Sequence, residues 1–363
     1  MGSLDEDAEV AMENGELLDS KNPAPGIKVA HEAYKSQGKN VMLAYAALGL
    51  YQMLMALWAA IGSKSLKGDT VPVSVFLLGR HCLAASALAA ISIWQYGPSS
   101  LIPRKEDRWR IAIAGVLAQY GSPMFYLYGL QFVPPTIASI FDGPFIPLVV
   151  YVMAVSVGAE VLPKLSKDRL GVAIALALAS GGAATLILVS GGDSETESVE
   201  VSTGADDSNG MFNIAIICLI LEASSLGASI IMQKPVVSKY KLFPFACWIS
   251  LSGLVSCIFH LTFVGDGVLS SMFSLIEMCN KSTPFFGALL YNALALTLIN
   301  SLCIAYANAT VPSSVVALAA CVQPGLTLML DVTIYGAPFS VWHLVALAMV
   351  AIGISMFNKH AAA

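Results

Sequence analysis

The chain has 363 residues, of which 56% are hydrophobic and 12% charged, with a mean hydropathy of +0.73. A soluble globular domain carries about 25% charged residues, so this composition excludes a soluble globular protein and indicates a protein of the lipid bilayer. The formal net charge is −5, and nearly all the acidic and most of the basic residues lie in short hydrophilic stretches between apolar runs. The net charge therefore gives no indication of a nucleic-acid partner.

Residues 1–40 contain no apolar run, so we expect a disordered cytosolic tail without a cleavable signal peptide. The sequence ENGELL at 13–18 fits an acidic dileucine sorting pattern, which is typical of traffic to vacuoles or endosomes and also arises by chance. The first apolar run must then direct insertion into the membrane.

Ten apolar runs follow, each near the length of about 20 residues that crosses a hydrocarbon core of about 30 Å. Because lipid offers no partner for backbone polar groups, each run is predicted to be a helix, and the fold class is an all-α integral membrane protein. The predicted spans are 41–62, 71–94, 111–132, 134–157, 170–190, 211–232, 243–264, 285–308, 312–334 and 338–357. Only a tight turn separates 132 from 134, and 308 from 312.

The distribution of Lys and Arg predicts the orientation. With the N-terminus in the cytosol, 15 of the 19 basic residues fall in cytosolic segments, whereas the opposite loops hold only Lys64, Lys67 and Lys281. Both termini are therefore expected in the cytosol. The acidic stretch 191–210 becomes a flexible non-cytosolic linker between two five-helix halves. The expected parts are the tail 1–40, the first half 41–190, the linker 191–210, the second half 211–357 and a cytosolic tail 358–363.

The two halves resemble each other. Residues 132–160 and 310–337 share a Val-Pro start, a stretch of small residues and a proline, Pro147 or Pro324, at the same distance from the end. Since five is an odd number, the second half crosses the membrane in the opposite sense. Inverted repeats are typical of secondary transporters, whose substrate site lies near the middle of the membrane between the halves.

Two motifs resemble the EamA type of the drug/metabolite transporter superfamily. They are VPVSVFLLGRHCLAA in the second span and LYGLQFVPPTIASIF, followed by a proline and GAE, across the third to fifth spans. The resemblance covers about 41–357 and is greatest to plant drug/metabolite exporters, the nodulin-like and Walls-Are-Thin-related permeases. It implies transport of small organic metabolites, such as amino acids or auxin-like acids. One departure is that Glu160, which ends the first repeat, is matched by Ala337 in the second.

Polar residues inside the spans are the candidates for substrate binding, because a charge at the centre of a bilayer costs about 2.5–3.5 kcal/mol on insertion scales. Glu222 lies at the centre of the span 211–232, near the middle of the membrane, where we expect it to line the cavity. The alternatives are an error in the span boundary or a purely structural hydrogen bond. Arg80 and Asp142 each lie eight residues after a proline near the start of a span, so they are at equal depths and we expect them to face each other, with Arg80 binding a substrate carboxylate. The alternative is a static ion pair that fixes helix packing. The candidate set is Arg80, Asp142, Glu222, Gln119, Tyr120, Asn300 and Gln323.

Three prolines inside spans, Pro144, Pro147 and Pro324, are candidate hinges, because a proline removes a backbone donor and bends a helix. Each could equally be a static packing kink. Small residues such as ALALASGGAATL at 175–186 are expected to let helices approach closely.

No enzyme signature or metal-ligand spacing is present in the sequence; six cysteines lie in apolar runs and Cys279 lies in a predicted loop. We therefore expect a transporter of small organic solutes that works by alternating access, with no catalytic residue, cofactor, metal or nucleic-acid partner. The alternatives are a multi-span receptor or sensor without transport, and a membrane-embedded enzyme. The plasma membrane is the expected location, with a vacuolar or endosomal membrane as the alternative. The sequence leaves open a proton as coupling ion and a homodimer.

Overall fold

The computed structural model describes residues 40–58, 73–130, 141–160, 165–192, 205–265, 267–336 and 339–361. The tail 1–39, most of the linker 191–210 and the turn at 132/134 lie outside these ranges, so the predictions made for them are not tested. The chain divides into two compact units, Met1–Ala46 and Ala47–Ala363. Of the first unit, only the helical residues 40–46 are described. The description below concerns the second.

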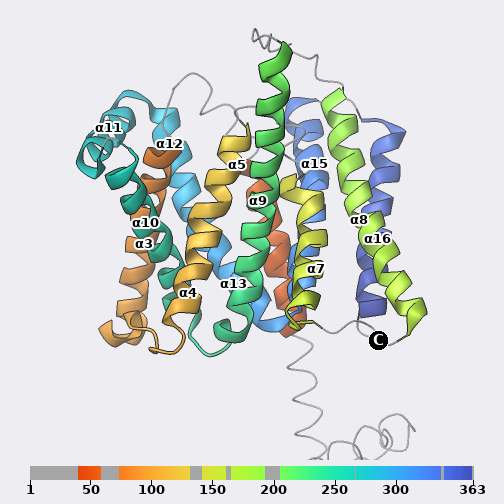
Figure 1. Cartoon of the computed structure of the whole chain (residues 1–363), viewed down its shortest axis with the longest axis horizontal. Coiled ribbons are helices and arrows are strands. Elements are labelled where there is room, and N and C mark those ends of the chain that lie inside the picture. The colour runs from red at the N-terminus through yellow and green to blue at the C-terminus, as the bar shows by residue number, and fades with distance from the viewer. Residues whose placement is uncertain are drawn as a thin grey trace, which may run out of the picture. The chain divides into compact units, whose positions relative to one another are not determined.

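Every regular element in the described ranges is helical, as the fold class predicts (Figure 1). The first helix is Asn40–Trp58. The others in the first part of the chain are α3 (Val73–Tyr96), η1 (Pro98–Leu101), α4 (Arg108–Gly115), η2 (Val116–Gly121), α5 (Ser122–Leu130), η3 (Phe141–Phe145), α7 (Ile146–Ser156) and α8 (Ser166–Gly192). The second part holds α9 (Ala205–Val237), α10 (Leu242–Phe263), α11 (Val268–Lys281), α12 (Thr283–Tyr291), η4 (Asn292–Ile299), α13 (Asn300–Thr310), α14 (Ser313–Leu318), η5 (Ala319–Val322), α15 (Gln323–Tyr335) and α16 (Val341–Ala361).

Eight helical segments in the described ranges are long and apolar enough to cross a membrane. They are Asn40–Trp58, Val73–Tyr96, Ser166–Val189, Met211–Val237, Leu242–Phe263, Thr283–Thr310, Ser313–Ile334 and Val341–His360. The predicted span 134–157 corresponds to the shorter apolar helix Gly143–Ser156, and 111–132 corresponds to the segment α4, η2 and α5. The expected turn near 308/312 is confirmed, since α13 ends at Thr310 and α14 begins at Ser313. The count of ten spans stays a prediction.

Helix α11 corrects the sequence analysis, which placed Cys279 in a loop. Its large apolar residues fall on two faces. Leu275, Met278 and Cys279 pack against buried Phe76 and Phe285, whereas Leu269, Met272, Phe273 and Ile276 are exposed. Such an amphipathic helix of 14 residues is too short and too polar on average to be recognised as a span.

Helices α8 and α16 lie side by side (Figure 1), and small residues set their spacing. A methyl group at Gly353 of α16 would come within 2.5 Å of the Ala179 nitrogen and 2.7 Å of the Ala175 carbonyl oxygen. Only glycine allows this approach of the two backbones. The expectation that the small residues of 175–186 serve close packing is confirmed.

Helix α9 is the central element of the second unit. It packs against α4, α5 and α7 from the first part of the chain and against α13 from the second part. Helices α3 and α10 are also in extensive contact, and α3 packs against η4 while α10 packs against η2. The side chains of Arg80 and His81 in α3 reach Gln119 in η2. The polar residues of these segments therefore meet inside the helix assembly.

Candidate substrate site

Arg80 lies in the first half of α3, and neutral acceptors hold its partly buried guanidinium. Nη1 donates to Asn292 Oδ1 at 3.2 Å, and Nη2 lies 3.4 Å from both the carbonyl oxygen and Oε1 of Gln119. A guanidinium stays protonated in proteins, so its charge is spread over these amides rather than neutralised by them. The arrangement produces a positive potential that would attract an anion.

The neighbouring residue His81 is fully buried and supports this arrangement. Its Nε2 lies 2.9 Å from the Gln119 carbonyl oxygen, which can only accept a hydrogen bond. This contact therefore requires the tautomer with a proton on Nε2. The ring then cannot accept from Arg80 Nε, 3.4 Å away, and that contact is one of packing.

Gln119 extends the polar cluster toward a cavity. Its Oε1 faces Arg80, while its Nε2 donates to Ser301 Oγ at 3.2 Å. Gln119 and Ser301 both line a cavity of about 40 Å³ among η2, α9, α10 and α13. The other polar residues of its wall are Ser229 and Gln233, which bond to each other at 2.7 Å. The amide of Gln119 thus connects the charge of Arg80 to the cavity wall.

A second cavity, of about 20 Å³, lies next to the first. Both are lined by Leu226, Ile230 and Ile304, so an aliphatic partition separates them. The polar residues of the second wall are Tyr51, Gln52 and Gln323. Cavities of this size hold a few water molecules at most, so an organic solute can enter only if the helices move apart.

Three irregular helical segments lie near the site, and two of them carry polar residues of the cluster. The π-helix η2 contains Gln119 and Tyr120, the π-helix η4 begins with Asn292, and the π-helix η3 contains Pro144. Such π segments inside α-helices occur frequently at functional sites, because the extra residue per turn redirects side chains.

The 3₁₀ turn η5 has an identifiable cause in Pro324. A proline has no N–H to donate to the carbonyl four residues earlier, here Ala320. The N–H of Gln323 bonds to the Ala320 carbonyl instead, which tightens the turn and positions Gln323 at the cavity. Pro147 is the second residue of α7, directly after η3.

The remaining predicted site residues lie apart from the cluster. Glu222 is 1% exposed, and its Oε1 accepts from Ser122 Oγ at 3.1 Å between α5 and α9. Tyr120 packs beside the His260 ring at a centroid distance of 5.9 Å. Asn300 is 2% exposed, and its amide has no hydrogen-bond partner in the described part of the chain. The side chain of Asp142 lies outside the described residues, so its pairing with Arg80 stays a prediction.

Glu160 and Lys234 converge on the turn between α13 and α14. Glu160 Oε1 accepts from the Ser314 backbone N–H at 2.9 Å, which satisfies a donor in the first turn of α14. The Lys234 ammonium donates to the carbonyls of Asn308, at 2.7 Å, and Val311. The two side chains therefore stabilise the end of one helix and the start of the next.

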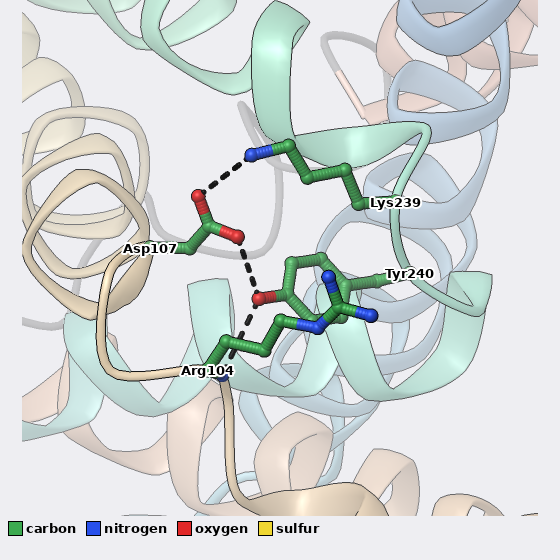
Figure 2. A network of polar contacts seen from close by, with 4 residues as sticks. All are labelled: Arg104, Asp107, Lys239 and Tyr240. Atoms are coloured by element: carbon green, nitrogen blue, oxygen red, sulfur yellow. Dashed lines mark hydrogen bonds and ion pairs between the residues drawn. The ribbon is translucent and has the colours of Figure 1, made fainter.

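A further polar network joins the segment before α4 to the turn between α9 and α10 (Figure 2). Asp107 accepts from Lys239 Nζ at 3.0 Å and from the Tyr240 hydroxyl at 2.8 Å, and that hydroxyl accepts from the Arg104 N–H at 3.3 Å. Burial raises the pKa of Asp107, but hydrogen bonds from Tyr240 and Lys239 and the charges of Lys239 and Arg104 outweigh it, so the net pKa is lowered. Burial and the bond to Asp107 raise the pKa of Tyr240. The network connects segments that are far apart in the sequence.

Sequence reasoning missed Gln52, Asn292 and Ser301 as site residues. Gln52 lies at the centre of the predicted span 41–62, just as Glu222 lies at the centre of 211–232. Selecting every Asn and Gln near the centre of a span, and not only charged residues, could therefore have found Gln52. Asn292 lies in the first half of its span, and no sequence signal indicates that it meets Arg80, 212 positions away.

Comparison with known proteins adds evidence of family and fold. Residues 213–359 match the model of the EamA-like transporter family. A crystal structure of a protein that is 14% identical to this chain superposes with a TM-score of 0.60, over 89% of this chain and 98% of that chain. At this identity the likeness concerns the fold alone. The family match supports the drug/metabolite transporter superfamily and, with the apolar helices, a multi-pass integral membrane protein that transports small solutes.

Proposed function

We propose that the whole chain is a secondary transporter of small organic solutes of the drug/metabolite transporter superfamily, and that it works by alternating access. The observation that carries the proposal is the polar cluster of Arg80, Gln119, Asn292 and Ser301, which reaches a cavity between apolar helices. A membrane protein that buries a cation beside a cavity has a means of attracting an anionic solute into the bilayer. The substrates we propose are amino acids and auxin-like organic acids.

The positions of the irregular segments support two inverted five-helix repeats. Segments η2 and η4 lie in predicted spans 111–132 and 285–308, the third of each half, and η3 and η5 lie in the fourth of each half. A methyl group at Gly143 of η3 would lie 3.8 Å from the Ala320 carbonyl oxygen of η5 and 3.9 Å from Pro324 Cγ, so the two segments face each other. Interrupted helices at matching places in two halves are typical of transporter binding sites.

The roles follow from these positions. Arg80 binds the substrate carboxylate, and Asp142 releases it by competing for the guanidinium or by taking up a proton. Pro144 lies within η3, and Pro147 and Pro324 follow η3 and η5, where the helices bend as the cavity opens to one side and then to the other. We further propose that the chain has ten spans with both termini in the cytosol. We place it in the plasma membrane and in the plant exporter subgroup.

Uptake of labelled solutes into proteoliposomes tests the function. The labelled panel contains amino acids, indole acids and sugars, and empty liposomes are the control. We expect saturable uptake of at least one organic acid. If the purified protein bound a solute from this panel with a defined stoichiometry but moved none across the membrane, the receptor alternative would replace transport.

A further inference from the structure

Gln52 is a buried amide without a partner. Its side chain is 1% exposed, and neither Oε1 nor Nε2 has a hydrogen-bond partner within the described residues. Buried polar atoms are nearly always paired, so an unpaired amide at a cavity indicates that something else provides its partner.

The cavity that Gln52 lines is otherwise largely apolar. Ile146, Leu226, Ile304 and Val316 form walls, and Gln323 adds a second amide from the start of α15. These residues come from five elements, namely the Asn40–Trp58 helix, α7, α9, α13 and the segment from α14 to α15. An apolar pocket with a small number of polar groups is typical of a site for an organic ligand.

The chemistry of an amide limits which group can satisfy it. A carboxamide both donates and accepts, through Nε2 and Oε1. A carboxylate only accepts and would leave Oε1 unpaired, whereas an ammonium only donates and would leave Nε2 unpaired. A carboxamide or ureido group of a ligand pairs with both atoms of Gln52. A site with a buried amide rejects a ligand that lacks the matching group more strongly than an apolar site does.

We infer that the cavity at Gln52 binds the carboxamide or ureido end of a small carboxylate whose anionic end is held by Arg80 and Gln119. The inference rests on the proposed function and names the substrate class of the same site. Leu226, Ile230 and Ile304 line both cavities, so an elongated solute with a short aliphatic middle can contact both polar ends once the helices separate. Such a solute would satisfy Gln52 and compensate the charge of Arg80 together.

Three five- or six-carbon acids test the inference. Glutaramate carries a carboxylate and a carboxamide, 5-oxohexanoate replaces the amide NH₂ by a methyl group of similar size, and glutarate replaces the carboxamide by a second carboxylate. Uptake of labelled glutaramate into proteoliposomes is measured with each acid as unlabelled competitor. We expect unlabelled glutaramate to halve this uptake at a concentration at least tenfold lower than either of the other two acids requires. In the Gln52→Met variant, which keeps side-chain length, we expect glutaramate to lose this advantage while 5-oxohexanoate competes as before.

A binding measurement separates this inference from transport itself. Glutaramate is expected to raise the melting temperature of the detergent-solubilised protein, and not that of the Gln52→Met variant. Stabilisation without uptake would leave the carboxamide site in place and refute transport. Saturable uptake of other solutes with no preference for glutaramate, or a preference that survives Gln52→Met, would overturn the inference and leave transport standing. Neither stabilisation nor uptake of any solute would overturn both.

Discussion

At the scale of single residues, the arrangement around Arg80 explains how a cation is tolerated among apolar helices. Amide oxygens of Gln119 and Asn292 and the Gln119 carbonyl accept its hydrogen bonds, so the charge is solvated by fixed dipoles. Sequence reasoning identified Arg80 and Gln119 as candidates because polar residues are rare in spans. It could not identify their contact, because they lie 39 positions apart and only the folded arrangement of the helices brings them together.

The role of Asp142 is tested by exchanging the two charges. Arg80→Asp and Asp142→Arg are made together, and the surface amount and the uptake of an organic acid are both measured. If Arg80 binds substrate, we expect the double variant to recover its surface amount relative to either single variant but to stay at least tenfold slower in uptake. Recovery of full uptake would show a static pair and contradict the binding role.

Replacing Asp107, at the centre of the network in Figure 2, is expected to lower the free energy of unfolding. Asp107→Asn removes the ion pair with Lys239, whose side chain is 41% exposed against 4% for Asp107. Because one partner is near solvent, we expect a loss of only about 1 kcal/mol in the free energy of unfolding. The exposed pair Lys281 and Glu277 provides the control, and Glu277→Gln is expected to leave the melting temperature unchanged.

The pH dependence of the same variant has a defined sign. The pKa of Asp107 is lowered in the folded protein, so the carboxylate stabilises the fold above its unfolded pKa of about 3.9. The stabilisation is lost as the pH falls through the lower folded pKa. Thermal melts should therefore separate wild type from Asp107→Asn at pH 7, and the separation should shrink progressively as the pH falls below about 4. A difference that persisted unchanged below that pH would contradict the assignment.

At the scale of elements, hydropathy predicted the long helices because lipid-facing and buried residues of a span are both apolar. It could not predict η2 or η4, because one additional residue in a turn leaves the average hydropathy unchanged. Hydropathy also did not predict helix α11, because the residues on its polar face lower the average hydropathy of that stretch of sequence. The π segments η2 and η4 therefore emerge only from the packing of neighbouring helices, whereas Pro324 in the sequence accounts for the turn at η5.

The close approach of α10 to η2 depends on Gly253. A methyl group there would lie 2.6 Å from Gln119 Cβ and 3.2 Å from His81 Cε1. Gly253→Ala should force the two helices apart, lower the free energy of unfolding by about 1–3 kcal/mol and reduce uptake by displacing Gln119. Gly287 of α12 has no atom within 4 Å of such a methyl group, so Gly287→Ala is the matched control and should be neutral or stabilising. Equal melting temperatures and uptake for both variants would refute this role of Gly253.

At the scale of the whole molecule, the charge distribution predicts which segments face the cytosol. An epitope tag inserted within 195–207 should be accessible from outside the cell, or from an organelle lumen, whereas tags at either terminus should be accessible only from the cytosol. Antibody labelling of intact and permeabilised cells distinguishes these positions. If the linker and both termini were on the same side, ten spans would be excluded.

The central claim is that the cavity beside Ser301 is a transport path that opens to both sides of the membrane. Its most direct test is the reactivity of Ser301→Cys, in a variant that lacks the seven natural cysteines and retains uptake, toward a membrane-impermeant methanethiosulfonate reagent. In oriented vesicles the account predicts modification when the reagent is supplied from either side, and protection by a transported acid from both. Modification from one side only, in a protein that still transports, would contradict it.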